Sequence, residues 1–407
     1  MMKRIIPLII IAALFLASSQ AKTRKAIFII VDGVPADCVE RLQSPTLSAI
    51  AHEGGYSRAY CGGEVGTPTE TKTISAVGYT NILTGTWMNK HNVRGNDNIQ
   101  ANYNYPTLFR IAKDQQRPVT TAIYSSWLDN RTVLLGDGKP ETRNLKIDYI
   151  FDGYELDKSA FPHQDGDLHI RDIDGHVCKE AAKCIRENAP DLNWVYMWYT
   201  DDAFHQRGYG KFTDEALMNA DRQLKGVWDA IKYREKNFDE EWLVIITTDH
   251  GRTFDGHGHG GQSATERTVW MVTNQKKLNT EWGRSTLSHV DICPTICRYM
   301  DFTLPRDVQF EQEGIPFIGH TDIFDLQTKT YDDKLYLTWQ HKGKKTMAKV
   351  YIATTNNFAS GGNDDWVEVC EVPAAAGKAS IDLSKYKSDF RKVVVATPYT
   401  SLTRWVK

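Results

Sequence analysis

The chain has almost no net charge. Its 49 lysine and arginine residues balance 51 aspartate and glutamate residues, which leaves a net charge of −2 over 407 residues. This balance gives no support for a nucleic-acid partner or for binding to a charged membrane surface. Internal repeats and low-complexity segments are also missing. The remaining composition, 41% hydrophobic and 25% charged, is that of a globular protein with room for a large core and a second domain.

A long apolar segment is the second missing feature. The run at 5–17 falls short of the roughly 20 residues that cross a bilayer, so we expect no stable membrane span. Lys3 and Arg4 precede this run, and Ser-Gln-Ala at 19–21 follows it. The pattern predicts a secretory signal that is cleaved near Ala21, with export to the periplasm or the extracellular space. An uncleaved anchor is the alternative.

Cysteine is sparse, and no Cys-x-x-Cys pair suggests a metal site. The seven cysteines are an odd number for an exported chain, so at least one stays free or pairs between molecules. Cys178 and Cys184, and likewise Cys293 and Cys297, lie within predicted helices. We expect both pairs to be core thiols.

Five apolar runs without polar alternation define the first part of the chain. Such runs are typical of parallel strands covered by helices on both faces. They are 25–33, 119–126, 192–201, 242–251 and 268–274. Amphipathic stretches at 174–188 and 214–236 lie between them. This alternation predicts an α/β sandwich over residues 22–325.

The residue pattern of the sequence changes after about Asp325. Short alternating runs rich in Val, Tyr and Thr predict a small all-β module, a sandwich at 330–407. We expect this module to fold separately and to be unnecessary for chemistry on a small substrate. Trp339, Trp366 and Trp405 are expected in its core, with an aromatic binding platform as the alternative.

Acidic residues close three of the apolar runs: Asp32, Asp201 and Asp249. A single strand-end aspartate is usually a helix cap, but three are hard to explain in that way. Ligands gather beyond the carboxyl ends of strands in open α/β sheets. His250 follows Asp249, and His205 stands four residues after Asp201, a helical spacing that lets one ion bind both.

A glycine-rich loop, FDGHGHGGQS, adds His257 and His259. Mixed nitrogen and oxygen ligands of this kind suit zinc better than magnesium or calcium. Each motif alone has an ordinary structural explanation, and Asp202 is an alternative to Asp201. The prediction of a metal centre depends on their joint occurrence after apolar strands.

The order of these elements resembles the alkaline phosphatase superfamily: IIVDG, a hydroxyl residue ahead of Thr-Gly, Asp-x-x-x-His, then TDHG. Within it the chain is most similar to the type I phosphodiesterase/nucleotide pyrophosphatase branch, over about residues 25–300. The resemblance implies an alkaline-phosphatase-like α/β/α sandwich with a mostly parallel sheet. It also implies a phosphoester hydrolase with two zinc ions, other divalent metals being the alternative.

The resemblance also implies roles for individual residues. The family places its nucleophile ten residues before the Gly of its Thr-Gly element, which here points from Gly85 to Ser75. Its His-x4-Asn element matches His91 to Asn96, which implies that Asn96 contacts a phosphate oxygen. The amides of Ser75 and Ala76, at the start of a helix, would be further donors.

The implied ligands form two sets. The first zinc would bind Asp32, Ser75, Asp249 and His250. The second would bind Asp201, His205 and a third histidine. His259 resembles the third ligand of some family members, with His257 as its rival and His289 as a weaker choice.

The chain departs from the family around the nucleophile. Most members of the branch have Thr there, followed by Pro-Asn-His, whereas Ser75 is followed by Ala-Val-Gly. Sulfatases of the superfamily need Pro and Arg after their Cys or Ser, and both are missing here. The sequence therefore argues against a sulfatase.

The favoured function is an exported phosphodiesterase or nucleotide pyrophosphatase that acts on a small phosphoester through a phosphoseryl intermediate. A phosphomonoesterase is the first alternative. It would need one more cation, for which Lys72, Arg94 and Lys158 are candidates. Transfer to an acceptor other than water is another alternative. So is a glycan- or surface-binding protein with a vestigial enzyme domain. The oligomeric state stays open.

Overall fold

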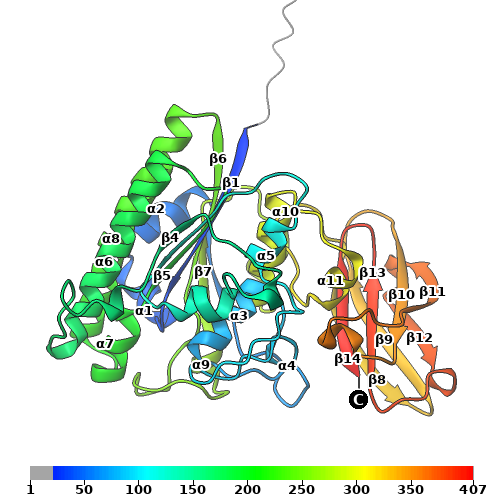
Figure 1. Cartoon of the computed structure of the whole chain (residues 1–407). Coiled ribbons are helices and arrows are strands. Elements are labelled where there is room, and N and C mark those ends of the chain that lie inside the picture. The colour runs from blue at the N-terminus through cyan, green and yellow to red at the C-terminus, as the bar shows by residue number, and fades with distance from the viewer. Residues whose placement is uncertain (1–21, 407) are drawn as a thin grey trace, which may run out of the picture.

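A seven-stranded sheet forms the centre of the larger part of the molecule (Figure 1). The computed structural model describes residues 22–406, so the predicted signal at 1–21 lies outside the described residues. Across the sheet the strands are β2 (Gly55–Tyr60), β7 (Thr268–Thr273), β6 (Glu240–Thr247), β1 (Thr23–Val31), β5 (Leu192–Met197), β3 (Thr121–Ser125) and β4 (Tyr149–Phe151). The five strands from β6 to β4 are parallel to one another. The predicted fold class, an α/β sandwich with a mostly parallel sheet, is confirmed.

One predicted strand runs in the other direction. We expected β7 to be parallel with the other apolar runs, but it pairs antiparallel with both β6 and β2. A parallel return needs a crossover of a dozen or more residues, usually a helix. The connection 248–267 contains only the four-residue helix α9 (Ala264–Arg267). Its other residues form the loops of the candidate site, so β7 turns back beside β6.

Helices cover both faces of this sheet (Figure 1). Phe28 and Ile30 of β1 pack in one core with α3 (Ser75–Thr84), α5 (Leu108–Lys113) and α10 (Ile292–Tyr299). Ile27 and Ile29 point to the opposite face, since side chains alternate along a strand. That face packs against α1 (Ala36–Leu42), α2 (Pro45–Glu53), α6 (Leu168–Glu187) and α8 (Lys211–Asn237). The result is three layers, which explains why β1 is apolar at consecutive positions.

The cysteines belong to these cores. All seven are free thiols, and six of them are buried. Cys178 and Cys184 lie on α6, whereas Cys293 and Cys297 lie on α10. Both predicted pairs are therefore core thiols rather than disulfides.

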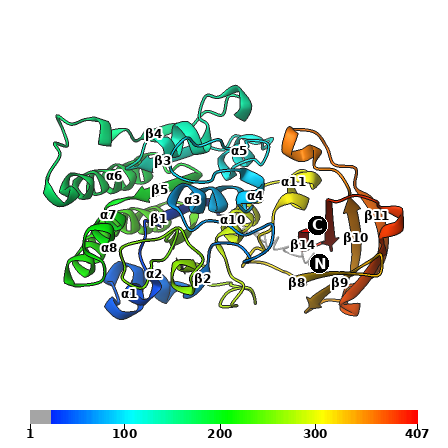
Figure 2. The same ribbon diagram turned by 90° about the horizontal axis from the view of Figure 1, so that it is seen from below.

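The smaller part of the molecule consists of two antiparallel sheets that share a core, and Figure 2 shows it beside α4 (Met88–His91) and α11 (Arg306–Glu311). One sheet has the order β11 (Val367–Pro373), β10 (Met347–Ala353), β13 (Arg391–Ala396) and β14 (Ser401–Val406). The other has the order β12 (Lys378–Asp382), β9 (Lys334–His341) and β8 (Ile323–Tyr331). We call residues 323–406 the β module; β8 starts it slightly before the expected boundary at 330.

Of the three tryptophans of the β module, Trp339 lies in the core as expected, whereas Trp366 and Trp405 are half-buried. Trp339 is buried, Trp366 packs edge-on against Phe310, and Trp405 packs edge-on against Phe390. Across residues 22–406, no helix combines the length and the apolar character that a membrane crossing requires.

Candidate metal centre and active site

The three strand-end aspartates meet at one edge of the sheet, because β1, β5 and β6 are parallel. Asp32 directly follows β1, and Asp249 lies just beyond β6. Asp201 is on α7 (Tyr199–Arg207), the helix that follows β5. All three are buried, at 1%, 0% and 7% exposure for Asp32, Asp249 and Asp201. His250 joins two of them: its Nε2 atom lies 3.5 Å from Asp32 Oδ1 and 3.3 Å from Asp249 Oδ2.

Ser75 is the first residue of α3 and lies beside this group. Ile74 before it is extended, so the backbone turns sharply into the helix at the serine. The Ser75 hydroxyl is 3.3 Å from His250 Nε2. The Ala76 amide donates to Asn96 Oδ1 at 3.0 Å, which brings Asn96 to the same helix end. The amide of Ala76 therefore orients Asn96, in contrast to our expectation that it is a free phosphate donor.

A second group lies next to the first. His205 Nε2 is 3.3 Å from Asp201 Oδ2, across one turn of α7. His259 Nε2 is 3.2 Å from His205 Nε2 and 3.9 Å from Asp201 Oδ1. Ligand atoms of Asp201, His250 and His259 lie within 4.8 Å of one another, as do those of Asp32, Asp249 and His250. The structure thus brings the first predicted set together. In the second group His250 stands where we expected His205, which lies beside Asp201 and His259.

The rival ligands lie elsewhere. His257 is exposed, and its Nδ1 atom donates to the carbonyl oxygen of His205 rather than facing the carboxylates. His289 is buried and donates from Nε2 to the Thr248 carbonyl oxygen at 2.8 Å. Asp202 is in neither ligand group of the described residues. Among the three candidate histidines, His259 is the one beside Asp201.

Backbone carbonyls set the tautomers of His250 and His259. His250 Nδ1 is 3.0 Å from the Gly251 oxygen, and His259 Nδ1 is 2.9 Å from the Thr73 oxygen. A carbonyl oxygen can only accept, so each Nδ1 carries the proton and each Nε2 presents a lone pair. Metal-binding histidines are commonly oriented in this way. Burial also lowers the pKa of both rings, which keeps them neutral.

The buried carboxylates need a positive partner. Asp32 Oδ1 and Asp249 Oδ2 are buried and accept no hydrogen bond. Burial and the nearby charges of Asp249 and Asp201 raise the pKa of Asp32 well above its ordinary value. Burial raises the pKa of Asp249 to about 6. Two unpartnered carboxylate oxygens beside an imidazole lone pair fit a divalent cation, whose charge would offset this repulsion.

Several supporting residues are not evident from the sequence. The hydroxyls of Tyr79 and Tyr196 both donate to Asp32 Oδ2 and leave its other oxygen facing His250. Arg252 is fully buried; it donates to the Gly33 carbonyl at 2.9 Å and forms an ion pair with Asp201. Burial alone would raise the pKa of Asp201, but Arg252 and His205 bring it below its ordinary value. A cation directly after TDHG was the only sequence signal for any of these contacts.

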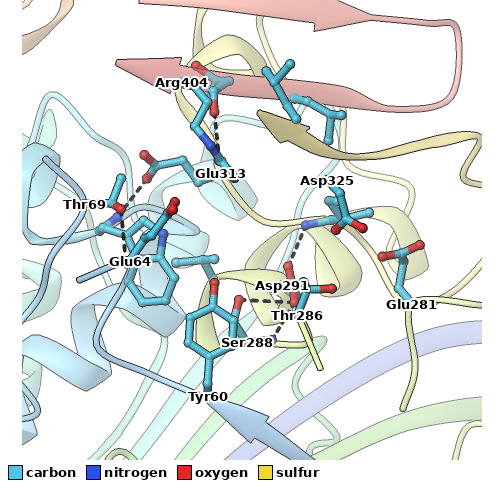
Figure 3. Close-up of a pocket in the computed structure, with 16 residues that line it drawn as sticks. Tyr60, Glu64, Thr69, Glu281, Thr286, Ser288, Asp291, Glu313, Asp325 and Arg404 are labelled. Carbon is cyan, nitrogen blue, oxygen red and sulfur yellow. Dashed lines mark hydrogen bonds between the residues drawn. The ribbon is translucent and has the colours of Figure 1, made fainter. Parts of the chain in front are cut away.

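A separate cavity of about 80 Å³ lies between the α/β part and the β module (Figure 3). It is rich in carboxylates, among them Glu281, Asp291 and Asp325, but contains no predicted site residue. The Asp291 carboxylate accepts from the amides of Ser288 and Ile315, so it is committed to local structure. This cavity marks the junction of the two parts rather than the reacting centre.

The fold and this centre define a hydrolase of the alkaline phosphatase superfamily. The sequence profile described as type I phosphodiesterase / nucleotide pyrophosphatase matches residues 26–255, and the chain belongs to this family. The predicted family is thereby confirmed. Among curated proteins no match was found.

Solved structures share the fold at low identity. A candidate sulfatase from Bacteroides thetaiotaomicron VPI-5482 is 12% identical, with a TM-score of 0.50 and coverage of 89% of this chain and 86% of its own. Murine ectonucleotide pyrophosphatase / phosphodiesterase 5 is 11% identical, with a TM-score of 0.47 and coverage of 69% and 96%. At these identities the first similarity supports the fold, and neither indicates the substrate.

Proposed function

We propose that the protein hydrolyses phosphodiester or pyrophosphate bonds in small substrates, using Ser75 as nucleophile and two zinc ions. The observation that carries this proposal is the position of the Ser75 hydroxyl. Ser75 is the first residue of helix α3, and its hydroxyl lies 3.3 Å from His250 Nε2, the atom that also faces Asp32 and Asp249. A nucleophile beside a group of metal ligands is activated without a separate base.

Two sets of side chains would hold the metals. Asp32, Asp249, His250 and Ser75 would bind one ion, and Asp201, His205 and His259 the other. When bound, zinc ions supply positive charge that lowers the pKa of a nearby hydroxyl and offsets the charge on phosphate oxygens. The tyrosine hydroxyls and Arg252 hold the carboxylates in place for this task.

The chain's own groups make and break the bonds at phosphorus. The Ser75 hydroxyl gives up its proton and its oxygen forms a bond to phosphorus, while the bond to the leaving oxygen breaks and that oxygen takes up a proton. This step gives a phosphoseryl intermediate. Water then gives up a proton as it attacks phosphorus, and the Ser75 oxygen departs and takes up a proton. Because Asn96 Oδ1 accepts from the Ala76 amide, its Nδ2 group is left to donate to a phosphate oxygen.

A diester fits this site better than a monoester. A monoester carries an additional negative charge and would need another cation in the pocket. Among the candidate cations, Arg94 donates to Asn92 Oδ1 rather than toward Ser75. Export after cleavage near Ala21 remains part of the proposal.

The test compares a p-nitrophenyl diester with the monoester, using zinc-loaded enzyme. We expect the diester to be cleaved faster. Ser75→Ala should lower the rate by several orders of magnitude while most metal is retained, because it removes the attacking oxygen. Ser75→Thr, which keeps a hydroxyl, should retain appreciable activity. A fully active Ser75→Ala enzyme would overturn the assignment, and a tenfold faster monoester would move the protein to the phosphatases.

A further inference from the structure

Asn96 lies in a segment without regular structure. Between the end of α4 at His91 and α5 at Leu108, the chain forms only turns and loops, and Asn96 itself is exposed. Local contacts hold the start of this segment: His91 Nε2 pairs with Asn81 Oδ1 at 2.8 Å, and the Asn102 amide donates to the His91 carbonyl. Asn92 Nδ2 also donates to the Gln100 carbonyl at 3.0 Å, and the Ala76 amide donates to Asn96 Oδ1. Further restraints come from the far end of the sequence.

The first restraint is a chain of buried charges. Lys90, on α4, has a fully buried side chain; its Nζ donates to the Glu311 carbonyl at 2.6 Å and lies 3.2 Å from Glu311 Oε2. Lys392, on β13, is also fully buried and lies 2.5 Å from Glu311 Oε1. Glu311, at the end of α11, therefore joins α4, which directly precedes the Asn96 segment, to the β module.

The second restraint starts from Lys392. Lys392 Nζ is 2.7 Å from Asp364 Oδ2, and the other oxygen of Asp364 accepts from the Asn357 amide at 2.8 Å. Asn357 opens the short helix η6 (Asn357–Ser360). Asp364 thus holds the start of η6 in place.

Helix η6 contacts the other end of the Asn96 segment. The Ala359 carbonyl accepts from Asn102 Nδ2 at 2.9 Å and from Asn104 Nδ2 at 3.0 Å. The Phe358 ring packs against Tyr105, with centroids 5.1 Å apart. Both rings are buried. Residues 90 and 102–105, on either side of Asn96, are therefore held by one set of contacts.

We infer that the β module positions Asn96 for catalysis, by clamping both ends of segment 90–105 through Lys392 and η6. The inference rests on the proposed function, in which Asn96 binds phosphate. Lys392 and Phe358 are positioning residues, since they act through Asn96 and do not touch the reacting atoms. A small displacement of a substrate-binding group far from the mutated residue can cost about a hundredfold in rate.

The test uses the whole chain with two single-residue variants. Phe358→Ala removes the ring contact with Tyr105. Asn102→Asp removes the donor to Ala359 but keeps the side-chain oxygen that accepts from the Asn104 amide. Leu337→Ala, a buried change inside the β module's own core, is the matched control for loss of stability alone. Each is also made in the Asn96→Ala background.

Amide hydrogen exchange measures how well segment 92–101 is held in place, and kcat/KM on a small aryl diester measures catalysis. We expect Phe358→Ala and Asn102→Asp to raise amide exchange across 92–101 and to lower kcat/KM between about ten- and a hundredfold. In the Asn96→Ala background the further loss should be less than about twofold, since the effects pass through one residue. Leu337→Ala should leave exchange in 92–101 unchanged.

Two results would overturn the inference: unchanged exchange in both variants, or equal losses of kcat/KM with and without Asn96. Failure of the proposed function gives a different pattern. In that case the unmodified enzyme does not cleave the diester, while exchange across 92–101 still rises in the two variants and supports the clamp.

Discussion

At the scale of single residues, the structure distinguishes His259 from His257 as the candidate third ligand of the second metal. His259 stands two positions from His257 in the same loop, yet its ring lies beside the Asp201 carboxylate and the His205 ring, whereas the His257 ring contacts the backbone carbonyl of His205. We expect His259→Ala to lose metal from the second set of ligands, whereas His257→Ala retains it. Metal analysis of the purified variants measures this difference. Asp249→Ala and His205→Ala, one from each ligand set, should also lose metal. Metal loss in His257→Ala alone would reverse the assignment.

At the scale of elements, the position of helix α3 determines how close Ser75 lies to the metal ligands. A Cβ atom at Gly78 would lie 2.7 Å from the Asp249 carbonyl oxygen, so the helix approaches the end of β6 as closely as glycine allows. We expect Gly78→Ala to push α3 away, lowering both Tm and the affinity for metal. Gly226→Ala on α8 is the matched control, since its Cβ would meet only Ala182 at 3.8 Å. This control should gain up to about 1 kcal/mol of stability from helix propensity. Equal behaviour of the two variants would contradict this account of Gly78.

At the scale of the whole molecule, a buried ion pair between Lys392 and Glu311 joins the two parts of the chain. We expected from the sequence that the β module is dispensable, but the buried pair of Lys392 with Glu311, which also contacts Lys90, favours the opposite outcome. A chain ending near Asp325 should be insoluble or inactive on a small diester. Lys392→Met in the whole chain is the milder change and should cost about 3–5 kcal/mol of stability, because it leaves the buried Asp364 carboxylate without a cationic partner. Thermal unfolding and activity assays measure both. A soluble truncated protein with the full rate would restore the original expectation.

Much of the fold and the composition of the site could be predicted from local patterns. Apolar runs such as that of β1 indicate strands buried on both faces, and parallel strands place their final aspartates at one edge of a sheet. Asp32, Asp201 and Asp249 therefore came together as predicted. The direction of β7 could not be read in this way, since an antiparallel strand buried on both faces has the same apolar pattern.

The sequence by itself determined five of the seven strands of the large sheet, the family and the set of candidate ligands, because each depends on residues close together or on a fixed spacing. Only the tertiary structure decided between His257 and His259, since the loop path sets which ring faces Asp201. It alone revealed Tyr79 and Arg252 at the carboxylates and the link from Lys90 through Glu311 to Lys392. Lys90 and Glu311 are 221 positions apart in the sequence, and Glu311 and Lys392 are 81 positions apart. No local pattern records such contacts, because they form only when the packed layers bring distant segments together.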